Sequence, residues 1–524
     1  MVNLSGARRR AGKLAAALVL GAMAVGLAAG CGADQVKFPA QPASADANQA
    51  AYDVGGSGKS DFFMLADSAG RFDRIGYDDD GDGRPDRIVR LDAIDPARCR
   101  HLLIVLDGMP FDAVAEFYRQ GHLRLFHPPQ VLIASYPSLT DVCLEDAFGY
   151  LPTRGLEAKY YDRAGGQEVG GKWAYVAGRG EPFSGIIDYR AGFIDDALSY
   201  LYPKGMFNKE INDSKQDWDR NPRMDSIYYY VSSAAVGTRL GHEGHLLVLR
   251  RVEQLVNRLY YETGGLVKVT MMADHGQTGI ACTEAGLDVL LTSKGWKLTD
   301  KVRADNEVCL TKFGIVTCAS LVARQPARLA DDLLTSPAVE LLSYPQGDRV
   351  VVRTRDGCAT IYTADGKTFE YACIRGDPLQ LKPLLGAAVM PASSPAAASQ
   401  ATSASWATSQ PAQVYRVNER DLLNRSVAQR AYYPDALIRL WRAHFAQVEN
   451  PPSIIVSLDD KYFNGQSFFA KSVSIQSTHG ALNWRNSATF IMSTIAPIDA
   501  PLRSTDVPAA MRKLTGRPFP PKAR

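Results

Sequence analysis

Three short segments place Asp or His residues at the ends of strongly apolar runs, where a folded sheet would present them together. They are Asp107-Gly108, Asp274-His275-Gly276 and Thr478-His479-Gly480. Carboxylates and imidazoles at the ends of strands hold divalent metals such as zinc. Thr140 lies between these segments in the chain. A Thr oxygen bound to zinc is a better nucleophile, and the same metal neutralises a phosphoryl oxygen.

Each of these residues also has a purely structural interpretation. Asp107 is a suitable N-cap for a helix that follows a strand, and Thr140 could cap a helix over 141–148. Asp274-His275 could form a turn without binding anything. We favour the metal-binding interpretation because all three segments follow the same pattern.

The surrounding sequence predicts an α/β fold with a mostly parallel central sheet and helices on both faces. Apolar runs indicate strands, and apolar residues at helical spacing indicate helices. The expected strands are 101–106, 131–134, 266–273, 453–458 and 488–492, and the expected helices are 113–120 and 245–261. In such sheets, ligands bind at the carboxyl ends of the strands.

The segments IVLDGM, YPSLTD, MADHGQT and THGALN occur in this order and resemble the alkaline phosphatase superfamily. The resemblance is strongest to its type I phosphodiesterase/nucleotide pyrophosphatase branch and covers roughly 100–280 and 430–495. It implies that Asp107, Asp274 and His275 bind one zinc. It also implies that Thr140 is the nucleophile and contacts that zinc, and that His479 binds a second zinc.

The second zinc site departs from the family pattern, in which an Asp and a His come from a D-x-x-G-H segment. Residues 232–241 fit that frame, but Ala234 stands where Asp belongs and Thr238 where His belongs. His242 and His245 follow closely, and either could supply a ligand.

Three functions therefore stay open. The first is an extracytoplasmic metal-dependent hydrolase of phosphoric diesters or nucleotide pyrophosphates, with one metal and slow hydrolysis of phospho-Thr140. The second is an inactive binding or structural lipoprotein. The third is a single-metal sulfate or phosphonate ester hydrolase.

The N-terminus predicts export and a lipid anchor. Residues 1–13 are basic, residues 14–30 are apolar and small, and Leu27-Ala28-Ala29-Gly30-Cys31 resembles a bacterial lipobox. Cys31 would carry the lipid, and Gly32 mildly favours the outer membrane or cell surface. Arg8, Arg9, Arg10 and Lys13 lie in this segment, and taking these four cations from the formal net charge of +3 leaves −1. The expected partners are a membrane and a phosphorylated substrate, not nucleic acid.

An acidic loop follows the first copy of a short repeat, GRFDRI at 70–75 and GRPDRI at 83–88. Its spacing resembles a calcium loop, with ligands expected from Asp78, Asp80, Asp82, the Arg84 carbonyl and Asp86. Val89 occupies the position of the usual bidentate Glu. We predict a structural calcium site, and a simple acidic turn is the alternative.

Export permits disulfides among the seven cysteines that follow Cys31. Asp365-Gly366 predicts a two-residue hairpin turn, and counting outward from it places Cys358 opposite Cys373. Cys309 and Cys318 bracket Phe313-Gly314 in a similar way. We predict the Cys358–Cys373 disulfide, with two free buried thiols as the alternative, and Cys309–Cys318 is a second candidate with less evidence for a turn.

The predicted organisation has seven parts. They are a signal peptide at 1–30, a flexible tether at 31–60, the acidic calcium-loop segment at 61–98, the first part of the core at 99–300, a small β-rich cap at 301–385, a low-complexity loop at 386–413 and the second part of the core at 414–524.

Overall fold

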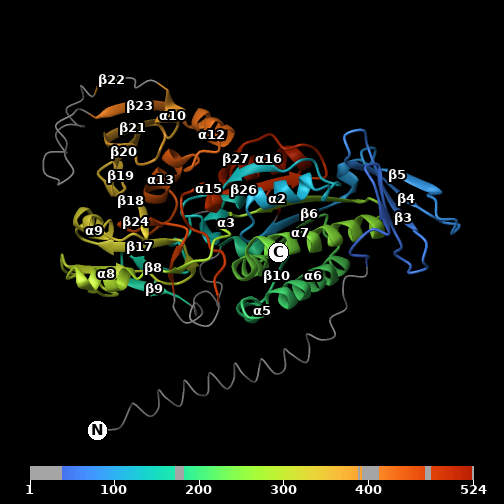
Figure 1. Cartoon of the computed structure of the whole chain (residues 1–524), viewed down its shortest axis with the longest axis horizontal. Helices are drawn as coiled ribbons and strands as arrows, with labels where there is room; N and C mark the ends of the chain where they lie inside the picture. Colours follow the sequence, from blue (N-terminus) through green and yellow to red (C-terminus); the bar gives the residue numbers. More distant parts are fainter. Residues whose placement is uncertain are drawn as a thin grey trace, which may run out of the picture.

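The computed structural model describes residues 38–150, 152–171, 182–386, 390–391, 412–465 and 474–521. Its three large sheets lie one after another along the long axis of the molecule (Figure 1). A five-stranded sheet lies at one end, a ten-stranded sheet at the other, and a seven-stranded sheet between them.

The seven-stranded central sheet confirms the predicted α/β class. In spatial order it contains β10 (Tyr189–Arg190), β11 (Asp225–Tyr230), β6 (Arg100–Leu106), β12 (Val267–Ala273), β26 (Ala488–Ser493), β7 (Gln130–Ile133) and β27 (Leu502–Arg503). The first four are parallel. Strand β26 runs antiparallel to both of its neighbours, and β27 is parallel to β7.

Helices cover both faces of this sheet, which explains why the inner strands β6 and β12 are buried on both faces. Leu102, Ile104 and Leu106 of β6 pack on the side of α2 (Phe111–Arg119), α6 (Pro203–Arg220) and α7 (Ser232–Thr263). Leu103 and Val105 pack on the side of α3 (Thr140–Phe148) and α16 (Val507–Thr515). Helix α5 (Phe193–Ser199) lies against α6 and α7.

The ten-stranded sheet is larger than the small cap that the sequence predicts. In spatial order it contains β14 (Lys297–Leu298), β15 (Glu307–Leu310), β17 (Cys318–Ala323), β24 (Ile454–Leu458), β18 (Val339–Gln346), β19 (Arg349–Arg353), β20 (Cys358–Thr363), β21 (Thr368–Arg375), β23 (Gln413–Asn418) and β22 (Met390–Pro391). The associated helices are α8 (Leu287–Ser293), α9 (Pro326–Leu333), α10 (Lys382–Leu385), α12 (Glu419–Ala428) and α13 (Ala436–Phe445).

The strand expected at 453–458 belongs to this second sheet and not to the central one. It forms β24, which pairs antiparallel with β17 and β18. Ile454 and Val456 pack into one apolar cluster and Ile455 into another, so both faces of β24 are buried. A strand buried on both faces has the same apolar sequence in either sheet.

The flexible tether predicted at 31–60 is wrong for residues 38–60, which contribute two strands to the five-stranded sheet. It contains β1 (Ser44–Ala45), β2 (Gln49–Tyr52), β3 (Phe62–Ala66), β4 (Phe72–Tyr77) and β5 (Arg87–Arg90). Residues 38–60 are folded because Phe38 packs on Tyr52, with ring centroids 4.9 Å apart, and on Tyr261 of α7. The two copies of the sequence repeat include the paired strands β4 and β5.

Two small sheets complete the strands. One contains β13 (Thr283–Glu284), β25 (Tyr462–Gly465) and β16 (Ile315–Val316), and the other contains β8 (Lys159–Asp162) and β9 (Gln167–Gly170).

The predicted disulfide and the second candidate are both wrong, because Cys309, Cys318, Cys358 and Cys373 are free thiols in the structure. A bulge after Cys358 places that residue opposite Arg375, while Cys373 pairs with Ala359. Cys358 and Cys373 consequently pack in different apolar clusters. Cys309 lies opposite Val322, and Cys318 lies opposite Ser457 on β24.

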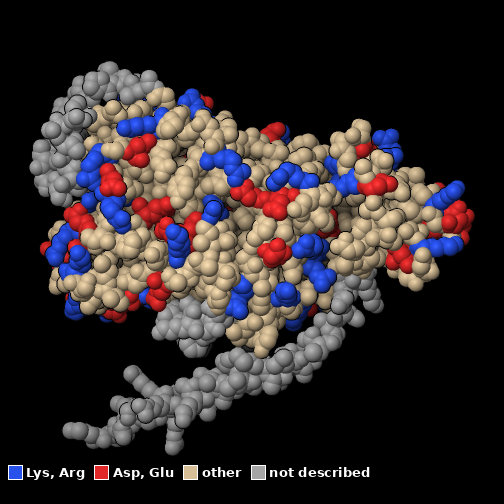
Figure 2. Space-filling view, in the orientation of Figure 1, with Lys and Arg blue, Asp and Glu red and all other residues tan. Residues whose placement is uncertain are grey.

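Several predictions fall outside the described residues. These are the signal peptide, Cys31 and most of the loop at 386–413. Within the described ranges, no helix has the length and apolar character needed to cross a membrane. Lys and Arg side chains alternate with Asp and Glu over the face shown in Figure 2, in keeping with the small net charge.

Candidate metal centre

The register of two parallel strands brings Asp107 and Asp274 together. Leu106 at the end of β6 pairs with Ala273 at the end of β12, so the next residue of each strand is an Asp. The turn after β6 approaches the second carboxylate closely, because the Gly108 N–H donates to Asp274 Oδ1 at 3.0 Å. This confirms that the two residues meet at the carboxyl edge of the sheet.

Asp107, Asp274 and His275 form a buried group whose ligand atoms all lie within 4.8 Å of one another. His275 Nε2 is 3.6 Å from Asp107 Oδ1 and 3.4 Å from Asp274 Oδ2. Within the part of the chain that the structure describes, neither of these two buried oxygens has a hydrogen-bond partner. The remaining oxygens are satisfied: Tyr229 donates to Asp107 Oδ2 at 2.5 Å, and the His275 N–H donates to Asp274 Oδ1 at 2.8 Å.

The protonation preferences of this group favour a bound cation. Burial lowers the pKa of His275 to about 4, so the ring is neutral. Its Nδ1 donates to the Gly276 carbonyl at 3.0 Å, which leaves the Nε2 lone pair available as a ligand. Burial raises the pKa of Asp274 to about 6, and burial together with Asp274 raises the pKa of Asp107 well above its usual range. A divalent cation would offset this buried negative charge, so these residues fit a metal site.

Thr140 lies at the same site. It is the first residue of α3, and its Oγ1 is 3.2 Å from His275 Nε2. The side chain is only partly buried, unlike the three acid and His residues beside it. The N-terminus of a helix also favours negative charge on a bound group. The predicted nucleophile therefore lies beside the predicted metal ligands.

His479 lies beside this group without being part of it. Its ring stacks on His275 with centroids 4.0 Å apart, and its Nδ1 donates to the Ser138 carbonyl at 2.9 Å. Burial and the neighbouring His275 lower the pKa of His479 to about 3. The sequence interpretation of its position is wrong in one respect, since residues 474–480 are irregular and do not form a strand that ends at His479.

Among the described residues, those present do not fit a second metal at the place that the sequence resemblance predicts. Ala234 and Thr238 lie on the first part of α7, before a break at Gly241, where φ is 60° and ψ is −140°. The break precedes the turn of helix that carries His245, which is buried. His242 instead pairs at the surface with Glu116, 3.2 Å away.

A residue that the sequence analysis missed, Gln277, occupies the space beside Ala234. Its Nε2 donates to the Ala234 carbonyl at 3.2 Å, and its Oε1 lies 2.9 Å from His245 Nε2. The pair is so close to α7 that a Cβ added at Gly237 would lie 2.1 Å from Gln277 Oε1 and 2.5 Å from His245 Nε2. In the sequence, this role could have been suspected from the position of Gln277, a polar residue two positions after His275. We conclude that an amide and an imidazole bond to each other here and that no ligand set for a second metal is formed.

We expect Gln277→Leu to lower the free energy of unfolding by about 1–3 kcal/mol, because the buried His245 Nε2 and the Ala234 carbonyl lose their partner. The number of bound metal ions should not change. Urea unfolding and metal analysis of the same sample measure both, with the exposed Gln120→Leu as the control. A loss of bound metal without a loss of stability would contradict this role.

Comparison with known proteins gives structural neighbours only. No family model matches the sequence, and no curated protein matches it. Ectonucleotide pyrophosphatase/phosphodiesterase 5 from human is similar in structure, with 11% identity and a TM-score of 0.40 over 81% of this chain and 97% of that one. The murine protein of the same name gives 11% identity and a TM-score of 0.38 over the same shares. A structure of an inactive murine variant in complex with AMP gives the same values as the murine protein.

The predicted calcium loop lies between β4 and β5. Asp78, Asp80 and Asp86 offer oxygens within 4.8 Å of one another, and Asp82 is not part of this group. Backbone N–H groups already satisfy two of these carboxylates: Gly81 and Gly83 donate to Asp78, and residues 79 and 80 donate to Asp86. Asp82 accepts from the Arg84 N–H at 2.8 Å. Calcium binding here stays a prediction.

Proposed function

We propose that this chain is a metal-dependent hydrolase of phosphoric diesters or nucleotide pyrophosphates that uses Thr140 as its nucleophile. Asp107, Asp274 and His275 would hold a single divalent cation. The observation that carries the proposal is the pair of unpartnered buried oxygens beside His275 Nε2, with the Thr140 hydroxyl 3.2 Å from that nitrogen. This is a nucleophile adjacent to a metal site that is closed on its other sides by protein.

The chain's own residues account for the first step. A zinc ion held by Asp107, Asp274 and His275 would supply Lewis acidity toward the Thr140 oxygen and a phosphoryl oxygen. Thr140 Oγ1 forms the new bond to phosphorus, the bond to the leaving alcohol or phosphate breaks, and the hydroxyl proton leaves toward the facing carboxylates and imidazole. Asp107 and Asp274 stay in place because Tyr229 and the Gly108 N–H bond their second oxygens. The product is phospho-Thr140 in which the phosphorus keeps the substrate's second ester group.

The second step is expected to be slow. Water must attack phospho-Thr140 to release a phosphate monoester, and a second metal would normally activate that water. Gln277 and His245 bond to each other in that region, and both are buried. We therefore expect phospho-Thr140 to accumulate.

The contact between Gln277 and His245 also favours one alternative. This is a protein that retains the fold and one metal but catalyses nothing. With Ala234 and Thr238 in place of ligands, such a chain would act by binding a phosphorylated molecule or a partner.

The experiment that tests the proposal is a zinc titration of metal-free protein with bis(p-nitrophenyl) phosphate as substrate. We expect nitrophenol release to saturate at one zinc per chain, and intact-protein mass spectrometry to find a p-nitrophenyl phosphoryl adduct on Thr140. Bound zinc with neither turnover nor adduct would establish the binding protein. Saturation at two zinc ions per chain would contradict the single-metal site.

We also propose that the chain is exported and anchored through a lipid on Cys31. The basic, apolar and lipobox segments of the N-terminus support this. Membrane fractionation with metabolic palmitate labelling tests it, and Cys31→Ala should release the protein and abolish the label.

A further inference from the structure

A cavity of about 90 Å³ is lined by residues of both the five-stranded sheet region and the central sheet. We call it the lysine cavity and define it by six of its lining residues, which are Arg71, Asp92, Leu125, His127, Lys268 and Ile495. Lys268 is the second residue of β12, and Asp274 follows the last residue of that strand. Six residues of a strand span about 20 Å, so the cavity lies apart from the candidate metal centre.

The ammonium group of Lys268 is buried at this cavity without a negatively charged partner. Only 4% of the residue is exposed, and its Nζ donates to the Leu91 carbonyl at 2.8 Å. No carboxylate pairs with it among the residues that the structure describes. Cys99 lies close to Lys268, but burial raises the pKa of its thiol, so a thiolate does not supply the missing charge. A buried ammonium ion without a counter-charge is costly, and a bound anion would offset that cost.

The other charges at the cavity are already balanced. Arg71 pairs with Asp67 at 3.6 Å, and Asp92 pairs with Arg90 at 3.1 Å. Burial, and after it the positive charge of Arg71, lowers the pKa of His127, so this ring is neutral at neutral pH. Within the described lining, the buried ammonium group is therefore left as an unpaired charge. A ligand that carries one negative charge would balance it.

The size of the cavity and its apolar lining restrict the ligand further. Liquid water occupies about 30 Å³ per molecule, so 90 Å³ corresponds to about three waters or to a ligand of about five heavy atoms. Much of the lining is apolar, with side chains from Leu91, Ile94, Pro96, Leu125 and Ile495. A short alkyl group would remove these side chains from water, whereas an inorganic oxyanion would not.

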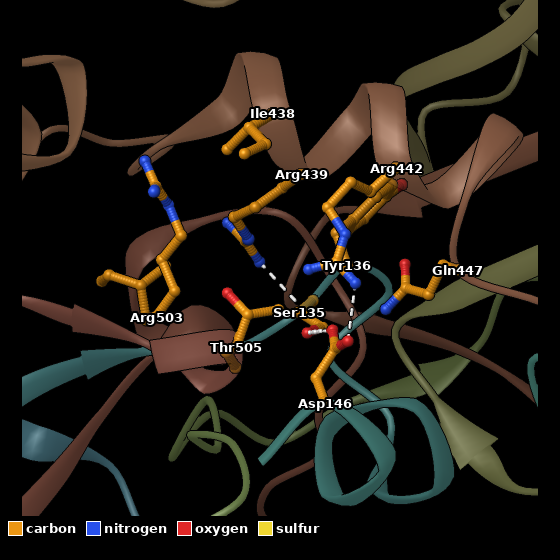
Figure 3. A pocket seen from close by; sticks show the side chains of 11 residues that line it. Ser135, Tyr136, Asp146, Ile438, Arg439, Arg442, Gln447, Arg503 and Thr505 are labelled. Atoms are coloured by element: carbon orange, nitrogen blue, oxygen red, sulfur yellow. Dashed lines mark hydrogen bonds and ion pairs between the residues drawn. The ribbon is translucent and has the colours of Figure 1, made fainter. Parts of the chain in front are cut away.

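The cavity drawn in Figure 3, between β7, α3 and α13, does not offer a comparable site. Its volume is about 20 Å³, which is enough for about one water molecule. Arg442, which lines it, pairs with Asp146 at 2.6 Å, and the Ser135 hydroxyl donates to the same carboxylate. Of these two cavities, the lysine cavity is therefore the one with room for a ligand.

We propose that the lysine cavity binds a short-chain monocarboxylate of the size of propionate. One carboxylate oxygen would accept from the Lys268 ammonium group, which has two N–H donors besides the one that bonds Leu91. The other oxygen would accept from the His127 ring, which is half-buried and whose side chain has no partner among the described residues. The alkyl group would contact Leu125 and Ile495.

A ligand at this place would connect two parts of the fold. Arg71 directly precedes β4 and Leu91 directly follows β5 in the five-stranded sheet, whereas Lys268 lies on β12 of the central sheet. Binding should therefore raise the midpoint of thermal unfolding. The site stands on these lining residues and does not depend on the proposed hydrolase activity.

Isothermal titration calorimetry with sodium propionate tests the site in the full chain, in a buffer that contains no other carboxylate. We expect one propionate per chain, with binding at least about tenfold weaker after Lys268→Met, which removes the charge and keeps the length of the side chain. Ile94→Trp, at a partly buried lining residue, should weaken binding similarly, because it fills the cavity and keeps the ammonium group. The control is Lys513→Met, since Lys513 is exposed and pairs with Asp499 on the surface, and it should bind propionate as the parent does.

Two further ligands test the charge and the size that the cavity accepts. Inorganic phosphate and heptanoate should each bind at least about tenfold more weakly than propionate, because the first lacks an alkyl group and the second is too long. Equal or tighter binding of either one would contradict a site for a short monocarboxylate. If Lys268→Met fails to fold by circular dichroism, Lys268→Gln replaces it. No binding of propionate would show that Lys268 is a buried neutral amine, and equal affinity in the parent and both variants would place propionate elsewhere. Either result would overturn the proposal.

Discussion

Thr140→Ala is expected to lower turnover of bis(p-nitrophenyl) phosphate about 10³-fold or more while leaving the bound metal in place. Removal of an activated nucleophile commonly costs this much, because the remaining rate comes only from binding and electrostatic stabilisation. Thr140 is partly exposed at the start of α3, and its Oγ1 contacts His275 Nε2. Its hydroxyl is neutral, whereas the buried carboxylates of Asp107 and Asp274 provide the negative charge of the site. The metal affinity should therefore change far less than the rate.

Two further variants sharpen this test. Thr140→Ser keeps a hydroxyl and should retain turnover, whereas Thr335→Ala removes an exposed threonine and should change nothing. The phosphoryl adduct seen by mass spectrometry should disappear in Thr140→Ala. Turnover within tenfold of the parent in that variant would show that the nucleophile is another group.

Asp274→Asn is expected to abolish zinc binding and yet stabilise the metal-free protein. The variant removes one of three ligands, and we expect zinc affinity to fall at least about 100-fold. Without metal, the parent chain buries Asp107 Oδ1 and Asp274 Oδ2 near each other with no partner for either. An Asn amide can donate to Asp107, while its carbonyl oxygen still accepts from the Gly108 and His275 N–H groups.

The expected gain in the free energy of unfolding is about 1–3 kcal/mol in the presence of chelator. Added zinc should reverse the order, because it stabilises only the parent. Urea unfolding with and without zinc measures both effects, and Asp112→Asn, at an exposed Asp that pairs with Arg430, is the control. A metal-free variant less stable than the parent would argue against a metal site of this kind.

The sequence alone was sufficient to predict four of the seven central strands, β6, β7, β12 and β26, and the edge at which the candidate metal ligands meet. Strands β6 and β12 are apolar runs covered on both faces, and each is followed directly by an Asp. A parallel sheet brings such residues to one edge whatever the detailed packing, so Asp107, Asp274 and His275 could be grouped in advance. The four motifs in order added Thr140, and the structure places it 3.2 Å from His275 Nε2.

Tertiary packing decided what local sequence could not. Strand β24 is apolar in the same way as a central strand, and only its pairing with β17 and β18 assigns it to the other sheet. The whole pairing of β20 with β21 is shifted by one residue from the predicted two-residue hairpin, so Ala359 lies opposite Cys373. Cys358 and Cys373 therefore pack in different clusters, because side chains alternate along a strand. Helix α7 breaks at Gly241, and the part of the helix after the break carries His245. His245 contacts Gln277, which lies 32 positions further along the chain. The family resemblance predicted that Ala234 and Thr238 stand in place of two metal ligands. Only the tertiary structure showed that the Gln277 amide and the His245 imidazole bond to each other beside Ala234, because such contacts depend on how the helix and the loop pack.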